Sequence, residues 1–342
     1  MVGGKALTAV CAAAILWHSG GARREEANMD RVRRSWRRGA LEVWSGATNV
    51  GVLRRGGRVL LIGGAPAGVL GQARVPIDAV DWVLVTHHHR DAAEGARDAA
   101  ERGAKVGAPE AERHLLERAD EFWADDRFRV HAYSFHPSRL TVREPVPVSR
   151  GFRDGEVLEW QGTKVKAIST PGPTDGGMTY VVECDGVRAA FIGDLMCAPG
   201  KVWEFYSLQG PLPAPGYGVS EYHGFGERIT KTLASLRRVL EEKPGVLVPT
   251  HGEVIEHPEE AVRLLEERAS AALRSYWRTS SGRWYFSGAR PEWPRDLSEM
   301  EARRCGLPSW VRQIGGTSRL ILADDGHALL IDSDGDIPER VV

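Results

Sequence analysis

The sequence predicts an α/β protein built from two related halves. Short apolar strands alternate with segments whose apolar residues recur at helical spacing, and this alternation is typical of α/β architectures. An internal repeat indicates the two halves: residues 48–64 (TNVGVLRRGGRVLLIGG) align without a gap to residues 178–194 (MTYVVECDGVRAAFIGD). Each copy contains a strand, a glycine turn and a second apolar strand. The alternative is that the two hairpins resemble one another by chance.

The composition describes an ordinary globular protein with a balanced surface. The chain has 342 residues, a formal net charge of -1 and 42% hydrophobic residues, which suits one large or two smaller domains. No overall basic field is available to hold a nucleic acid, so we expect a small-molecule substrate and no nucleic-acid partner. The 4 cysteines lack the spacing of a zinc site and are not expected to bind metal.

The order of elements is predicted from the apolar pattern. Residues 50–64 form two strands joined at Gly56 and Gly57, residues 81–86 (DWVLVT) form a strand, and residues 91–106 (DAAEGARDAAERGAKV) form a helix. The second half repeats this alternation of strands and helices, with strands predicted at 163–170, 178–194 and 245–250 and helices at 227–244 and 257–277.

Residues 1–30 resemble a secretory signal peptide. Lys5 precedes an apolar run at 6–17, and Gly20 and Ala22 occupy the small-residue positions before a possible cleavage point. Cleavage would place the protein in the periplasm or outside the cell; otherwise it would be cytoplasmic. The run is shorter than the ~20 residues of a membrane-spanning helix, so we expect no integral membrane span.

The C-terminal part is predicted to lie outside the main domain, which we place at 31–275. Residues 276–310 form a tryptophan-rich linker or docking strip, and residues 311–342 form an extra hairpin. Its segment 317–333 (TSRLILADDGHALLIDS) is a third copy of the repeat and resembles the start of a second such domain. An isolated hairpin is unstable, so it must pack on the main domain, mediate self-association, or belong to a longer protein.

Polar side chains follow the ends of several predicted strands. His87 and His89 come after strand 81–86, and Asp194 and His251 follow two later strands. Because side chains beyond the carboxyl ends of such strands converge on one crevice, these segments should meet. His87 and His89 should project to the same side while His88 points away, since the side-chain period of an extended segment is two. Two imidazoles so placed can bind one metal ion.

Four motifs together resemble the metallo-β-lactamase superfamily. They are HHHRDA at 87–92, TPGPTDGG at 170–177, FIGD at 191–194 and THGE at 250–253. The family pattern is a His-x-His-x-Asp-His run, a histidine within Thr-Pro-Gly-His, a Gly-Asp after a strand, and a late His-Gly. The resemblance covers about 41–272. It implies an αββα sandwich, a metal site at one edge, and hydrolysis by a metal-bound hydroxide.

Two family ligands are missing from this chain. Ala92 and Pro173 stand where the family has histidine. The resemblance implies one site made by His87, His89 and Asp194, and a second made by Asp91, His251 and the shared Asp194. Each of these sites has lost one histidine.

One reduced site is therefore expected to hold a single ion rather than two. Catalytic zinc commonly has three protein ligands and an open position. Zinc is the expected ion, although two histidines with one carboxylate also suit iron, and the oxygen-rich second set suits manganese. If only the first site is filled, Asp91 is free to orient the attacking water and is the expected catalytic residue.

The substrate is predicted only by class, as a small ester, thioester or lactone. Trp203, Phe205, Tyr206 and His223 are the candidate pocket residues, because they lie in or near a Gly- and Pro-rich segment after Asp194. Further candidate ligands are His88, His131, His136, His257 and Asp175. Two other hypotheses remain open: a non-catalytic binding or scaffold protein on the same fold, and an iron-dependent oxygenase.

Overall fold

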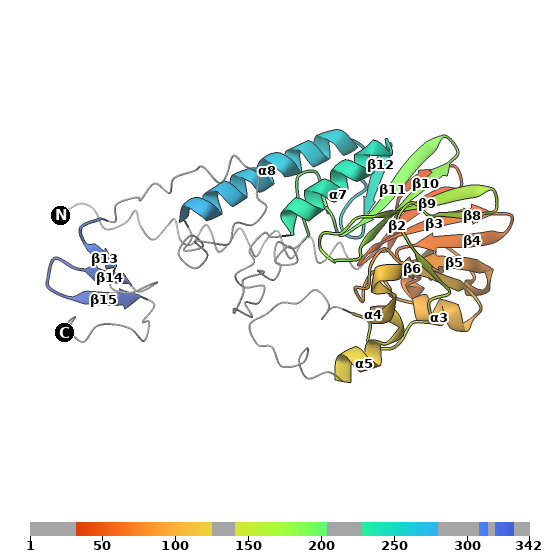
Figure 1. Cartoon of the computed structure of the whole chain (residues 1–342), viewed down its shortest axis with the longest axis horizontal. Coiled ribbons are helices and arrows are strands. Elements are labelled where there is room, and N and C mark those ends of the chain that lie inside the picture. Colours follow the sequence, from red (N-terminus) through yellow and green to blue (C-terminus); the bar gives the residue numbers. More distant parts are fainter. Residues whose placement is uncertain (1–31, 125–140, 204–227, 280–307, 314–318, 332–342) are drawn as a thin grey trace.

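Two β-sheets packed face to face form the centre of the molecule (Figure 1). The computed structural model describes residues 32–124, 141–203, 228–279, 308–313 and 319–331. The predicted signal peptide at 1–30 lies outside these described residues, as do the pocket candidates Phe205, Tyr206 and His223 and most of the 276–310 strip.

The first sheet has seven strands in the order of the chain. They are β1 (Arg33–Arg38), β2 (Leu41–Ser45), β3 (Asn49–Arg55), β4 (Arg58–Ile62), β5 (Val80–Leu84), β6 (Lys105–Pro109) and β7 (Arg150–Phe152). β1 to β4 are antiparallel neighbours, whereas β4, β5, β6 and β7 run parallel. The predicted turn between β3 and β4 is confirmed, since Gly56 and Gly57 both adopt positive φ.

The second sheet has the spatial order β12-β11-β10-β9-β8. Its strands are β8 (Val157–Trp160), β9 (Thr163–Ser169), β10 (Met178–Cys184), β11 (Val187–Gly193) and β12 (Val246–Pro249). Here β9, β10 and β11 are antiparallel, and β11 runs parallel to β12. The same sequence of two antiparallel pairs and one parallel pair occurs in β2-β3-β4-β5, which confirms the prediction of two related halves.

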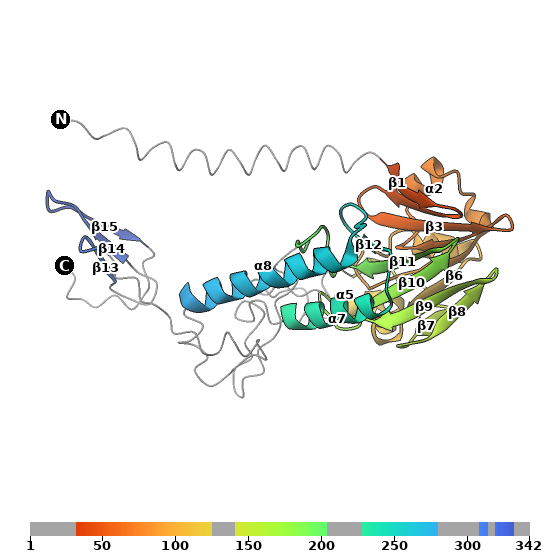
Figure 2. The same ribbon diagram turned by 90° about the horizontal axis from the view of Figure 1, so that it is seen from above.

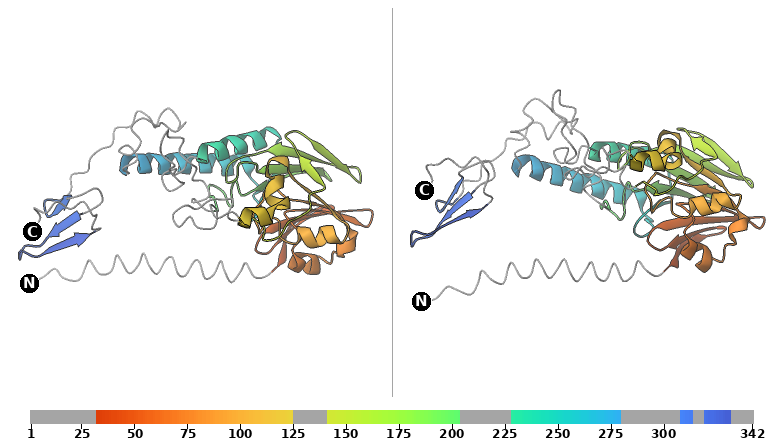
Figure 3. Two further views of the ribbon diagram at one scale, coloured as in Figure 1. Left: turned by 60° about the horizontal axis from the view of Figure 1, so that its bottom comes forward. Right: turned by 90° about the horizontal axis from the view of Figure 1, so that it is seen from below.

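Helices cover both outer faces. Those associated with the first sheet are α2 (Ala67–Gln72), η1 (Ile77–Ala79), α3 (Ala96–Glu101), η2 (Glu110–Glu112), α4 (Arg113–Glu117) and α5 (Ala119–Ala124). α7 (Ile229–Glu241) and α8 (Pro258–Thr279) pack on each other along the second sheet, as Figures 1 and 3 show. The amphipathic pattern of α7 explains this position, because Leu233, Leu236 and Val239 lie buried on one face.

Three apolar clusters fill the spaces between the layers. One joins the first sheet to its helices, one lies between the two sheets, and one joins the second sheet to α7 and α8. The sheets approach so closely that a Cβ on Gly51 would lie 2.4 Å from the Phe191 ring. The predicted αββα sandwich is confirmed.

One predicted helix is wrong in its extent. Residues 91–106 were expected to be helical throughout, but only α3 is a helix, and the last two residues begin β6. Gly95 adopts φ +70°, and a Cβ there would lie 2.1 Å from the Ala65 carbonyl oxygen. The chain therefore turns at Gly95 before the helix begins, which leaves 91–95 at the edge of the sandwich.

The C-terminal segment contains one strand more than the predicted hairpin. β13 (Val311–Gln313), β14 (Arg319–Leu322) and β15 (Ala328–Ile331) form a three-stranded antiparallel sheet (Figure 2). Trp310 and Leu329 are 53% and 60% exposed, so these apolar side chains are not covered within the described residues. None of the described helices is long and apolar enough to cross a membrane.

Candidate metal centre

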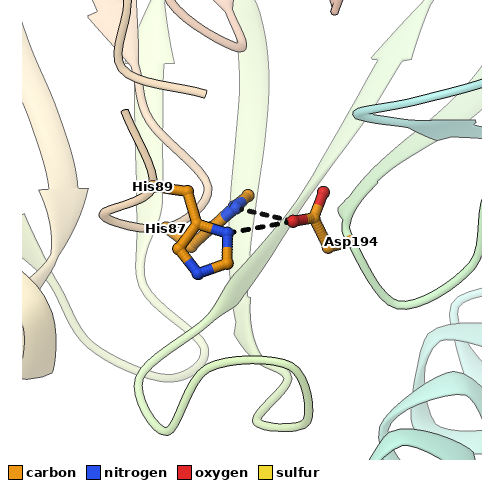
Figure 4. Close-up of side chains that lie close together, drawn as sticks. All are labelled: His87, His89 and Asp194. Carbon is orange, nitrogen blue, oxygen red and sulfur yellow. Dashed lines mark hydrogen bonds and ion pairs between the residues drawn. The ribbon is translucent and has the colours of Figure 1, made fainter. Parts of the chain in front are cut away.

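His87 and His89 lie at the edge of the first sheet and face the second. The chain leaves β5 through Val85 and Thr86, and both histidines are buried. His87 Nε2 lies 3.0 Å from Asp194 Oδ2, and His89 Nδ1 lies 3.1 Å from the same oxygen (Figure 4). Asp194 follows β11, so the group joins the two halves of the molecule.

These three side chains fit a metal ion. One ligand atom from each of His87, His89 and Asp194 lies within 4.8 Å of the others. Within the described part of the chain, Nε2 of His87, His88 and His89 and Oδ1 of Asp194 are buried without a hydrogen-bond partner. Buried polar atoms are rarely left without partners, and a shared cation would supply one.

The hydrogen bonds around His87 fix its orientation. Thr86 Oγ1 lies 2.9 Å from His87 Nδ1, which leaves Nε2 as the nitrogen that faces Asp194. Such a partner on the second ring nitrogen is common for histidines that bind metals, because it fixes the tautomer and the ring.

Without metal, the two histidines and Asp194 share protons unequally. Burial opposes a charge on His87, but the negative charge of Asp194 outweighs it and raises the pKa of His87 to about 9. Burial and the neighbouring charge of His87 lower the pKa of His89 to about 4. Although burial acts to raise the pKa of Asp194, the charges of the two histidines hold it well below its ordinary value. The buried carboxylate is therefore ionised and attracts a cation.

Asp91 and His251 contact each other beside this group. His251 Nε2 lies 3.0 Å from Asp91 Oδ2 and 3.9 Å from Asp194 Oδ1. His251 Nδ1 lies 3.2 Å from the carbonyl oxygen of Ala47, and the ring stacks on Trp203 at 4.2 Å between centroids and 14°. The sequence expectation that Asp91 stands free beside a single ion needs this correction: Asp91 is paired with His251.

The two substituted positions are not replaced by other ligands among the described residues. Ala92 is buried, and its backbone N–H donates to Asp91 Oδ1 at 3.0 Å. Pro173 borders a cavity of about 10 Å³ beside His87 and Asp194. That space is about the size of one water molecule, so it is too small for another side chain.

The other candidate ligands lie elsewhere. Asp175 forms a two-pronged ion pair with Arg228, with N–O distances of 2.9 and 3.1 Å. His88 bonds to Glu112 through its ring Nδ1, and its ring lies edge-to-face against that of His89, with centroids 5.1 Å apart. His257 lines a cavity at the turn between β10 and β11. His131 and His136 lie outside the described residues.

Glu112 was missed by the sequence analysis. It ends η2 and is only 3% exposed. A glutamate just after a strand is ordinary in sequence, and only its burial beside His88 reveals a role.

A cavity of about 300 Å³ is lined in part by Trp203. Its lining includes the turn between β2 and β3, Cys197, Lys201, Trp203 and the residues on either side of His251. Trp203 is 42% exposed, and its ring stacks on that of His251. Of the four predicted pocket residues, Trp203 is the one described, and its position beside the site keeps it a candidate.

Comparisons with known proteins agree with this arrangement. The sequence model of the metallo-beta-lactamase superfamily matches residues 43–251. Hydroxyacylglutathione hydrolases of Brucella ovis and Brucella canis are each 27% identical over 177 residues, or 48% of this chain. The match spans 57% and 56% of those relatives, little more than half of their length.

Solved structures share the fold. A B3 metallo-beta-lactamase with an active-site glutamic acid superposes with a TM-score of 0.51 at 21% identity, covering 73% of this chain and 95% of that one. A metallo-beta-lactamase of Cronobacter sakazakii with a HARLDQ motif gives a TM-score of 0.50 at 16% identity, covering 71% and 93%. At these identities the likeness concerns the fold alone.

Proposed function

The chain belongs to the metallo-beta-lactamase superfamily, and from this premise we propose that it is a hydrolase with one zinc ion on His87, His89 and Asp194. The observation that carries the proposal is the convergence of ligand atoms from these three side chains within 4.8 Å of one another. Three ligands with room for a fourth are the usual protein contribution to catalytic zinc.

A single ion is favoured over two by the spacing of the ligand atoms. Among the described residues, His87, His89 and Asp194 form the one group whose ligand atoms all lie within 4.8 Å of one another. His251 Nε2 lies 3.0 Å from Asp91 Oδ2 but 3.9 Å from the nearer oxygen of Asp194, and Trp203 covers its ring. A second ion would have only Asp91 and His251 in addition to the shared Asp194.

Bound zinc would supply a polarised carbonyl and a water of lowered pKa at this position. The protein's own residues orient the metal ligands and accept or donate protons. Thr86 keeps Nε2 of His87 facing the site. Burial lowers the pKa of His251, but its hydrogen bond to Asp91 and the charge of Asp194 raise it overall. The Asp91–His251 pair is thus suited to hold a proton at His251 Nε2, close to Asp194, and to release it to a leaving group.

A thioester is the substrate class we propose first, with esters and lactones next. The curated relatives are named for the hydrolysis of hydroxyacylglutathione, which is a thioester. Trp203 and the neighbouring cavity of about 300 Å³ offer an apolar surface within reach of the site. No described cluster of arginines marks a phosphate-binding site there.

The experiment measures zinc content and hydrolysis together. Purified protein should contain about one zinc per chain and hydrolyse a hydroxyacylglutathione, and His89→Ala should lose both. His114→Ala, an exposed change on α4, is the matched control. Zinc bound without turnover of thioesters, esters or lactones would favour a non-catalytic binding protein, and protein that takes up no zinc would refute the proposal.

A further inference from the structure

Glu112 is a wholly buried carboxylate whose oxygens are saturated by donors from two different loops. Oε2 accepts the backbone N–H of His88 and its ring Nδ1, both at 2.8 Å. Oε1 accepts the backbone N–H of Gly176 at 2.8 Å, and the Thr174 side chain also donates to the carboxylate. Burying an ionised carboxylate is costly unless it is fully hydrogen-bonded, so this arrangement is specific.

The two loops are the first two ligand motifs of the superfamily pattern. The loop at 86–91 carries His87 and His89, and the loop at 170–177 carries Pro173 in place of a histidine. A metal ion therefore cannot tie the second loop to the site through residue 173. Glu112 reaches both loops from η2 and joins them without a metal.

The contacts of Glu112 act on the orientation of the ligands. The N–H of His88 belongs to the peptide plane that follows His87, so a bond to it restrains that plane. The ring of His88 bonds to Glu112 and also lies edge-to-face against the ring of His89, with centroids 5.1 Å apart. Fixing His88 at both its backbone and its ring thus limits the rotation of its two neighbours.

We propose that Glu112 is a positioning residue that holds His87 and His89 in their metal-facing orientation by tying the loop at 86–91 to the loop at 170–177. The inference rests on the proposed function, because it assigns a role around the same ligands. Glu112 makes no contact with the reacting atoms and acts through His88.

Other bonds join the same loops and keep the fold intact when Glu112 is altered. The backbone N–H of Met178 donates to the carbonyl of Thr86 at 2.9 Å. Arg228 pairs with Asp175 and donates to the carbonyl of Gly172, which anchors the second loop to the start of α7. A change at Glu112 should therefore loosen the ligands rather than unfold the domain.

Glu112→Gln is the informative variant. An amide has one acceptor oxygen and one donor nitrogen, whereas every partner of Glu112 is a donor. If the oxygen serves His88, the NH2 group faces the N–H of Gly176, and one loop is released. Glu117→Gln on α4 is the matched control, because Glu117 is partly exposed and its partners, the Arg113 side chain and the backbone of Val148, lie outside both ligand loops.

The first measurement is hydrogen exchange of the metal-free proteins. Glu112→Gln should speed the exchange of the amides of His88 and Gly176 more than that of the amides of β10 and β11, beyond what any fall in the overall Tm accounts for. Glu117→Gln should leave both amides as in the wild type. This arm tests the tie itself and does not depend on metal binding.

The second measurement is zinc affinity by chelator competition, with the Co(II) absorption spectrum as a report on ligand geometry. Altering a group that orients metal ligands typically weakens binding about 10- to 100-fold. We expect such a loss and an altered spectrum in Glu112→Gln but not in Glu117→Gln. Wild-type zinc affinity and exchange in Glu112→Gln, or equal losses in the two variants, would overturn the inference. A wild-type protein that binds no zinc would instead refute the proposed function.

Discussion

Zinc should stabilise the metal-free protein against heat, and the size of the effect can be worked out. A ligand that binds only the folded state adds about 2.7 kcal/mol when its free concentration is about 100 times Kd. In a folding unit of roughly 150–250 residues, about 1 kcal/mol moves Tm by about 2–4 °C. The sandwich, within 32–279, is of this size. We therefore expect zinc to raise Tm by about 5–11 °C.

The shift should depend on the ligands that the structure brings together. Changing both His87 and His89 to alanine leaves Asp194 without either neighbour, so the shift should disappear. His251→Ala should keep most of it, because His251 pairs with Asp91 and lies 3.9 Å from the nearer Asp194 oxygen. His114→Ala on the exposed side of α4 should behave as wild type.

The assay is scanning calorimetry on chelator-treated protein, with and without zinc at a fixed excess over Kd. The reasoning is refuted if the double variant shows the full shift. It is also refuted if His251→Ala removes as much of the shift as the double variant does, since the ion would then depend on Asp91 and His251.

Three further results are expected. Zinc uptake at pH 7 should release about one proton, because the pKa of His87 is about 9 in the metal-free protein and only neutral imidazole binds metal. Calorimetry in buffers of different ionisation enthalpy measures this release, and the apparent zinc affinity should rise with pH up to about 9 and then level off. Burial acts to raise the pKa of Glu112, but the contact with His88 holds it well below its ordinary value of 4.5. The ionised carboxylate therefore stabilises the fold above pH 4.5, and this stabilisation is lost as the pH falls below that value. Glu112→Gln should accordingly reduce the fall in the free energy of unfolding that denaturant titrations measure between neutral and acid pH. Trp203→Ala should raise KM for an apolar thioester about 2- to 12-fold, the equivalent of about 0.5–1.5 kcal/mol of stacking. An unchanged KM would mean that Trp203 does not contact the substrate.

The sequence predicts the layers of the fold well because their signals are local. Apolar strands and glycine turns such as Gly56-Gly57 identify the hairpins without reference to the rest of the chain. The helix expected at 91–106 was too long because the turn at Gly95 is imposed by the neighbouring Ala65 carbonyl. Gly95 and Gly103, both with positive φ, flank the observed helix; the sequence shows these glycines but not the close approach of Ala65 that requires one of them.

The candidate site was predictable in its members but not in its pairings. Strand ends and spacing identified His87, His89 and Asp194, which the structure brings together. The contact between Asp91 and His251 depends on side-chain rotamers across two separate loops. The role of Glu112 depends on burial, which the sequence does not show.

The position of the site follows from the internal symmetry of the fold. β4 runs parallel to β5 in one half, and β11 runs parallel to β12 in the other. Beyond β5 the chain reads Thr86-His87, and beyond β12 it reads Thr250-His251. Equivalent strands thus deliver a histidine from each half to the same edge. The third ligand breaks the symmetry, since the repeat places Gly64 where the second half has Asp194. The single carboxylate directs Oδ2 to His87 at 3.0 Å and Oδ1 towards His251 at 3.9 Å, so its closer contact is with the histidine of the first half.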